Sequence, residues 1–292
     1  MKKSILFPML LLLLLCGCRS DRGHGQIAAT TLPVYTFTQA LCQNTGLTVE
    51  RLISEPVSCL HDYSLKVEQV QHAEAAEIIV ISGAGLEDFM TDILLDKSVI
   101  DASAGIPLLC GEEDHGDHGH DDDHHSHAQD PHIWLSPNNA MIMAQNICEG
   151  LCRQYPQYET TFSENLSELL QQLSALSDYG HQALGNLQYR DMITFHDGFA
   201  YFADAFDLTV LAAVEEESGS EASAKELIAL IQLVRAHQLP AVFTEINGSP
   251  SAASVISSET GAKIYSLDMA MASDSYFTAM YHNIDTIQEA LG

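Results

Sequence analysis

Positively charged side chains are scarce in this chain. Its 292 residues include 12 Lys and Arg against 40 Asp and Glu, so the net charge is 12 − 40 = −28 with histidine counted as neutral. This charge disfavours binding to nucleic acid or to an anionic membrane surface, because both ligands are polyanions. A cation is the partner that the composition favours.

Long apolar runs are also lacking, except at the N-terminus. Two lysines precede an apolar stretch over residues 5–15, which is too short to span a membrane and is typical of a secretory signal. The following Leu-Cys-Gly-Cys is similar to a bacterial lipobox, in which the new N-terminal cysteine carries a lipid. We predict a signal peptide over residues 1–17, lipidation of Cys18 and a tether over residues 18–26. The mature chain would be lipid-anchored on the extracytoplasmic face of the cell membrane; an ordinary cleaved signal is the alternative.

Paired cysteines cannot account for every thiol after Cys18, because five remain. Disulfides are permitted outside the cytoplasm, but an odd number leaves at least one thiol unpaired within the chain. Two of the five lie four residues apart on a predicted helix, where buried thiols are the more common finding. The sequence leaves the pairing open among Cys42, Cys59, Cys110, Cys148 and Cys152.

One segment has almost no apolar side chain to bury and is rich in histidine. Residues 112–129 cannot offset the entropy of being fixed, so we predict a mobile loop there. Imidazole nitrogens beside carboxylates bind late transition metals, and we expect the loop to gather metal, as a sensor or as a chaperone. A solvated charged linker is the alternative. Its histidines are His115, His118, His120, His124, His125 and His127.

Short apolar runs alternate with helical patterns along the rest of the chain. Strands that alternate with helices of this length imply parallel sheets covered on both faces. We predict an α/β fold of two lobes, residues 27–153 and residues 188–292, each with a mainly parallel sheet flanked by helices. The predicted strands cover residues 27–31, 47–53, 78–82, 99–102, 192–195, 208–214, 241–244 and 263–266.

Proline is absent between residues 158 and 187, where apolar residues recur at helical spacing. We predict one long, rigid linking helix within residues 154–187, with an apolar stripe that packs against both lobes. Two lobes joined in this way leave a cleft, and ligands of such folds bind where strand ends face it.

Four polar residues stand where they could enter this cleft. His61 lies in the connection after the second predicted strand, and His132 lies where the histidine-rich loop gives way to ordered chain. His196 and Asp268 directly follow the fifth and eighth predicted strands. Three neutral imidazoles and one carboxylate form a four-coordinate shell that zinc accepts readily.

Several motifs together span nearly the whole mature chain. They are His61-Asp62-Tyr63, Gly83-Ala84-Gly85-Leu86-Glu87, Asp130-Pro131-His132-Ile133-Trp134 and Phe195-His196-Asp197-Gly198-Phe199-Ala200-Tyr201-Phe202, with a weaker match at Leu267-Asp268. Through them the chain resembles the metal-binding lipoproteins of ABC-type zinc and manganese importers, the ZnuA-like or TroA-like family. The resemblance implies two α/β lobes bridged by a long rigid helix, with metal ligands at His61, His132, His196 and Asp268.

The resemblance also favours zinc over manganese. An acidic, histidine-rich insertion before His132 is similar to that of zinc-specific members, whereas manganese-handling relatives often carry a glutamate at the position of His196. Nitrogen ligands favour zinc as well. The chain departs from the family around His61, where Cys59 is an alternative donor. It also lacks the usual proline after Asp268, so Glu245 or water could fill the fourth place.

We therefore expect a monomeric, extracytoplasmic solute-binding protein without enzymatic activity. It would capture zinc and deliver it to a membrane permease served by a cytoplasmic ATPase. A manganese- or iron-binding member of the family is one alternative. A secreted zinc enzyme with Asp197 or Glu245 as general base is disfavoured, since no His-Glu-x-x-His pairing occurs. A metal-buffering adhesin is the third possibility.

Overall fold

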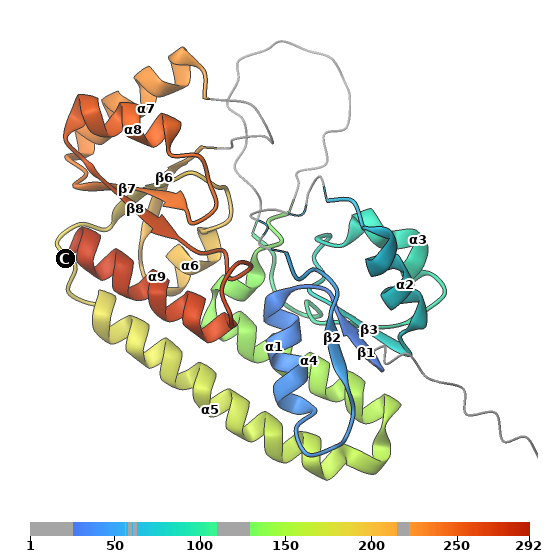
Figure 1. Cartoon of the computed structure of the whole chain (residues 1–292). Coiled ribbons are helices and arrows are strands. Elements are labelled where there is room, and N and C mark those ends of the chain that lie inside the picture. Colours follow the sequence, from blue (N-terminus) through green and yellow to red (C-terminus); the bar gives the residue numbers. More distant parts are fainter. Residues whose placement is uncertain (1–25, 56, 58–59, 61–62, 110–128, 215–221) are drawn as a thin grey trace, which may run out of the picture.

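The computed structural model describes residues 26–55, 57, 60, 63–109, 129–214 and 222–292 (Figure 1). The predicted signal peptide and the lipidated Cys18 lie outside the described residues. So do His61, Cys59, Cys110 and the six histidines of the 112–129 segment.

Four parallel strands form the sheet of the first lobe, in the order β2-β1-β3-β4. The central strands are buried on both faces: Ile27 and Ile79, for example, are fully buried. Such strands need helices on both sides of the sheet, because neither face can remain in contact with water. The strands are β1 (Ile27–Ala29), β2 (Val49–Arg51), β3 (Ile78–Ile81) and β4 (Ser98–Asp101), and the helices are α1 (Leu32–Leu41), α2 (Val67–Ala75), α3 (Thr91–Leu94) and α4 (Pro137–Gln154).

The second lobe repeats this arrangement with a parallel sheet in the order β6-β5-β7-β8. In both sheets the first strand of the lobe lies between the second and the third, a symmetry that is not visible residue by residue in the sequence. The strands are β5 (Asp191–Thr194), β6 (Thr209–Ala213), β7 (Ala241–Glu245) and β8 (Lys263–Leu267), and the helices are α6 (Ala200–Ala205), α7 (Ala224–His237), α8 (Ser251–Thr260) and α9 (Tyr276–Leu291).

Helix starts follow local sequence signals. The hydroxyl of Ser136 accepts a hydrogen bond from the backbone N–H of Asn139 at the start of α4, where Pro137 occupies the first turn. At α7, Ser223 and Glu226 form a reciprocal capping box. These caps satisfy backbone N–H groups that have no partner within the helix, and so they fix where each helix begins.

The long helix α5 (Glu159–Leu184) has 26 residues and confirms the predicted linking helix. At 1.5 Å per residue it is about 39 Å long. It packs against α1 and α4 of the first lobe and α9 of the second, and Figure 1 shows it running along both lobes. Gly180 allows Phe206, the residue that ends α6, to pack against α5, since a Cβ at Gly180 would lie 2.3 Å from a ring carbon of Phe206. The apolar stripe of α5 thus joins two lobes into one body.

The apolar spacing over residues 86–95 predicts a helix, but most of this segment is not α-helical. The pattern over residues 86–95 forms a 3-10 turn, Asp88–Met90, followed by only four helical residues of α3. Three consecutive residues before it, Gly83, Ala84 and Gly85, have positive φ angles of 82°, 55° and 84°. The backbone N–H groups of Leu86, Asp88 and Met90 then each bond to the carbonyl three residues back, so the segment begins as tight turns and not as an α-helix.

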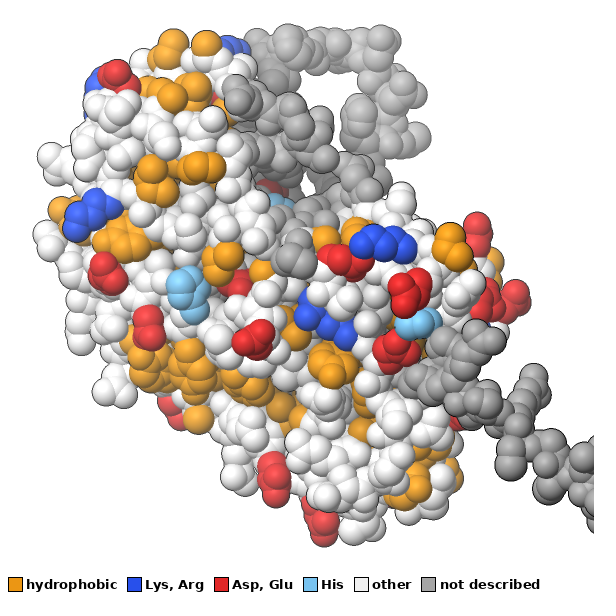
Figure 2. Space-filling view, in the orientation of Figure 1, with side chains coloured by type: hydrophobic (Ala, Val, Ile, Leu, Met, Phe, Trp, Pro, Cys, Tyr) orange, Lys and Arg blue, Asp and Glu red, His pale blue; other side chains and the backbone are white. Residues whose placement is uncertain are grey.

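Acidic side chains are scattered over both lobes on the face seen in Figure 2, rather than gathered in one patch. Cys42, Cys148 and Cys152 are free thiols, and burial raises the pKa of the Cys42 thiol to about 12. Within the described residues, no helix is both long and apolar enough to cross a membrane.

Candidate metal centre

Two imidazoles from different lobes meet at the inter-lobe boundary. His132 precedes a 3-10 turn, Ile133–Leu135, that leads into α4, and His196 lies two residues after the end of β5. Their Nε2 atoms lie 3.2 Å apart, and the rings are nearly perpendicular, at 84°. His132 is almost completely buried, with 2% of its surface exposed.

Each of the two imidazoles has a buried carboxylate beside its other nitrogen. The Asp130 carboxylate accepts hydrogen bonds from the backbone N–H of His132 and from its Nδ1, both at 2.8 Å. Oε1 of Glu245 lies 2.8 Å from Nδ1 of His196. An ionised carboxylate only accepts, so a hydrogen on Nδ1 and a lone pair on Nε2 of each ring would suit this arrangement.

The separation of the two Nε2 atoms suits either a hydrogen or a metal ion between them. A tetrahedral metal ion with bonds of about 2.05 Å would place its two nitrogen ligands about 3.3 Å apart. The observed 3.2 Å between the Nε2 atoms matches that value. The separation of His132 and His196 is therefore compatible with two nitrogen ligands of one metal ion.

The position of Glu245 beside Nδ1 of His196 was not predicted from the sequence. It is the last residue of β7 and is 7% exposed, and it faces Nδ1 of His196 rather than Nε2. The sequence had suggested it as a general base or as a replacement ligand. Its position at the carboxyl end of the strand next to β5 was the signal that could have revealed its role.

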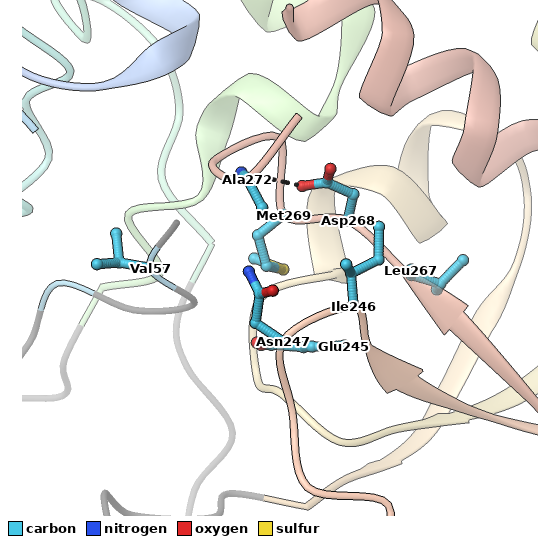
Figure 3. A pocket seen from close by; sticks show the side chains of 8 residues that line it. All are labelled: Val57, Glu245, Ile246, Asn247, Leu267, Asp268, Met269 and Ala272. Atoms are coloured by element: carbon cyan, nitrogen blue, oxygen red, sulfur yellow. Dashed lines mark hydrogen bonds between the residues drawn. The ribbon is translucent and has the colours of Figure 1, made fainter. Parts of the chain in front are cut away.

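Asp268 follows β8 and is 2% exposed. Asn283 of α9 holds its backbone, accepting from its N–H at 2.8 Å and donating to its carbonyl oxygen at 2.7 Å. Its carboxylate accepts hydrogen bonds from the Ser273 hydroxyl and from the backbone N–H groups of Met271 and Ala272. Figure 3 shows the one from Ala272. The loop that follows Asp268 thus engages both of its oxygens.

The four residues predicted as ligands are therefore only partly brought together. His132 and His196 form a close pair, Asp268 is turned into its own loop, and His61 lies outside the described residues. In the part of the chain that the structure describes, no group of three or more His, Cys, Asp or Glu side chains is close enough to hold a metal ion.

A small cavity opens beside this pair, between the lobes. Val57 of the first lobe lines one side, and Glu245, Asn247, Asp268 and Met269 of the second lobe line the other (Figure 3). Two carboxylate residues, Glu245 and Asp268, thus line this cavity. Their charge favours the entry of a cation over that of an anion.

Gly198 allows the two imidazoles to approach each other. A Cβ at this position would lie 2.8 Å from Cδ2 of His196, 2.9 Å from Nδ1 of His132 and 2.5 Å from Cε of Met269. A Cβ atom essentially never lies this close to another heavy atom, so any side chain at residue 198 would force its neighbours to shift. The glycine is a second feature of the site that the sequence motif contained but did not explain.

Further hydrogen bonds cross the lobe boundary. Trp134 Nε1 donates to the carbonyl oxygen of Met269 at 2.8 Å. The Tyr276 hydroxyl donates to the carbonyl oxygen of Trp134 at 2.9 Å. Arg51, at the end of β2, donates to the carbonyl oxygen of Met271 at 2.7 Å. The backbone after Asp268 is therefore attached to both lobes.

The family model described as "Zinc-uptake complex component A periplasmic" matches residues 27–290, which include both lobes and the histidine pair. The chain belongs to this family. As a member of the ZnuA family it also shares the two-lobe fold of solved relatives. A crystal structure of ZnuA is 27% identical and superposes with a TM-score of 0.78, covering 91% of this chain and 98% of that one.

Two curated relatives of this ZnuA-family chain are each 30% identical. The zinc-binding lipoprotein AdcA of Streptococcus pneumoniae serotype 4 matches over 99% of this chain, which spans 61% of the length of AdcA. A putative metal-binding protein of Treponema pallidum matches over 79% of this chain and 76% of its own length.

Proposed function

We propose that this ZnuA-family protein captures zinc outside the cytoplasm and delivers it to the permease of an ABC importer, served by a cytoplasmic ATPase. The observation that carries the proposal is the 3.2 Å separation of the two Nε2 atoms, each on a ring whose Nδ1 faces a buried carboxylate. The names of the family model and of AdcA support zinc as the cargo. Nitrogen ligands support zinc over manganese, which prefers oxygen.

His132 and His196 are the two ligands that the geometry supports best. We assign the remaining places to His61 and to Asp268, with water or Glu245 as the substitute for Asp268. Binding by Asp268 requires its carboxylate to leave the Ser273 hydroxyl or the loop amides. The protein is a binding module without catalysis, in keeping with a family of uptake components.

The experiment is a zinc titration of the mature protein against a chelator of known affinity. His132→Ala or His196→Ala should each weaken binding by orders of magnitude. His282→Ala is the matched control, because this exposed imidazole on α9 lies 3.1 Å from the carbonyl oxygen of Ser266 and is not part of the pair. Affinity within a few-fold of wild type in both site variants would exclude this site.

The histidine-rich segment is assigned to gathering zinc before it reaches the tight site. Deleting residues 113–127 should remove weak sites and keep one tight site in the same titration. Loss of the tight site instead would show that the two roles are reversed.

The cargo and the membrane attachment have separate tests. Elemental analysis of protein purified without chelator, followed by competition between zinc and manganese, identifies the metal. Cys18→Ser should move the protein from the membrane fraction to the soluble fraction, as expected for a monomer anchored by one lipidated cysteine and in line with the relatives named as lipoproteins. Failure to grow under zinc limitation after gene deletion would separate import from metal buffering or adhesion.

A further inference from the structure

Tyr201, on α6 of the second lobe, reaches the backbone of the first lobe at two points. Its hydroxyl donates to the carbonyl oxygen of Asp130 at 3.0 Å and accepts from the backbone N–H of Leu109 at 2.9 Å. The residue is 3% exposed. Both hydrogen-bonding functions of a buried phenol are used in this way, which is the arrangement that makes a buried hydroxyl stabilising.

The two backbone groups that Tyr201 joins are also bonded to each other. The N–H of Asp130 donates to the carbonyl oxygen of Leu109 at 3.0 Å. Leu109 and Asp130 stand on either side of the histidine-rich segment in the sequence. Leu109 and Asp130 are therefore neighbours in the fold, and Tyr201 of the opposite lobe is bonded to both.

From Asp130 the contacts continue directly to the metal pair. The Asp130 carboxylate holds both the backbone N–H and Nδ1 of His132 at 2.8 Å. Tyr201 itself lies five residues after His196, on the helix that follows β5 and this histidine. One hydroxyl thus connects the lobe that carries His196 to the residue that orients His132.

We propose that Tyr201 is a positioning residue for the metal pair, whose hydroxyl fixes Asp130, and through it the His132 imidazole, against the lobe that carries His196. This inference rests on the proposed function of the pair as a zinc site. The same hydroxyl also bonds Leu109, so the two residues on either side of the histidine-rich segment, Leu109 and Asp130, are held together beside His132.

The test is Tyr201→Phe, which keeps the ring and removes only the hydroxyl. Zinc affinity should fall about tenfold, because loss of outer-shell partners of metal-binding histidines costs ten- to a hundredfold. Tyr276→Phe is the matched control: that hydroxyl is fully buried and donates to the Trp134 carbonyl oxygen at 2.9 Å, also across the lobe boundary, but not to Asp130 or Leu109. The control should bind zinc within about twofold of wild type. An equal loss in both variants would mean that general lobe packing is responsible, and would overturn the proposal.

A double-mutant cycle asks whether Tyr201 acts through Asp130. If it does, Tyr201→Phe added to Asp130→Asn should weaken zinc binding by much less than it does in the wild type. Full additivity would overturn the proposal. The absorption spectrum of the Co²⁺-loaded protein should also change in Tyr201→Phe and not in Tyr276→Phe, since it reports ligand geometry and not stability.

A measurement without metal keeps this inference separable from the proposed function. In the metal-free wild type, the Nδ1 hydrogen of His132 should exchange slowly with water in NMR spectra, and Tyr201→Phe should accelerate the exchange. Unchanged exchange would overturn the positioning role. Absence of tight zinc binding in the wild type would instead overturn the proposed function and leave the exchange result to be judged by itself.

Discussion

Nε2 of His132 and Nε2 of His196 lie 3.2 Å apart, although the residues are 64 positions apart in the sequence and come from different lobes. Neither lobe alone contains this pair, so its geometry depends on how α5 holds the two lobes together. A rigid linking helix suits a site of this kind, because a change of about 1 Å between the lobes would separate the ligands of a small ion. The predictions below address what holds the pair in place.

Removing the charge of either carboxylate beside the pair should weaken zinc binding. Asp130→Asn and Glu245→Gln should each lower the zinc affinity ten- to a hundredfold, because the carboxylate orients the ring and increases the basicity of Nε2. Competition titration with a chelator measures the change. Glu289→Gln, at an exposed position on α9, is the control and should bind as the wild type does. Unchanged affinity in both site variants would contradict the proposed role of the carboxylates.

Gly198→Ala should disturb the pair by bulk alone. The added methyl group would lie within 3 Å of His132, His196 and Met269, so we expect at least tenfold weaker zinc binding. Overpacking of a filled site also costs about 1–3 kcal/mol of stability. Gly248→Ala serves as the control, because its methyl group would come no closer than 3.3 Å to Glu245. Titration and urea unfolding of both variants check the two effects; normal zinc binding by Gly198→Ala would refute this prediction.

Asp268 has two possible roles that a pair of variants distinguishes. If it is the fourth ligand, as we propose, Asp268→Asn should weaken zinc binding about tenfold or more. Ser273→Ala should leave binding equal or slightly stronger, because it releases the carboxylate from the serine hydroxyl. Isothermal titration calorimetry measures both. If the two variants lose stability alike and keep the wild-type affinity, Asp268 is a loop cap and water completes the shell.

Glu87 should make the stability of the first lobe depend on pH. Its fully buried carboxylate accepts hydrogen bonds from the Thr30 hydroxyl and from the backbone N–H groups of Ser82 and Gly83. Burial nevertheless raises its pKa from 4.5 to about 7. The folded state therefore binds the proton more tightly than the unfolded state does. The contribution of Glu87 to the free energy of unfolding should fall as pH rises from about 4.5 to 7, by an amount on the order of 3 kcal/mol.

The variant Glu87→Gln cannot titrate at this position and isolates that contribution. An amide nitrogen will meet one of the backbone N–H groups, so the variant should be less stable at pH 5, and only the change with pH is compared. Urea unfolding of the metal-free proteins at pH 5 and pH 7.5 should show the gap between variant and wild type narrowing at the higher pH. Parallel pH profiles would show that Glu87 keeps an ordinary pKa.

The sequence by itself was sufficient for the α/β class, the two-lobe organisation and the long helix. These features depend on local patterns: the spacing of apolar residues sets the period of each element, and proline-free runs such as that of α5 set its length. His196 could also be singled out by its motif and its place after a strand, and His132 by its motif. The helix predicted over residues 86–95 is mostly absent, because apolar spacing does not distinguish an α-helix from the tight turns that begin this segment.

Only the tertiary structure decided what these residues contact. The order of the strands brings β7 beside β5, and this places Glu245 against His196. The same long-range packing turns the Asp268 carboxylate toward Ser273 and brings the Tyr201 hydroxyl to Asp130. Contacts of this kind join positions far apart in the chain through single side-chain rotamers. Local pattern carries no information about them, because they are fixed only when the two lobes pack against one helix.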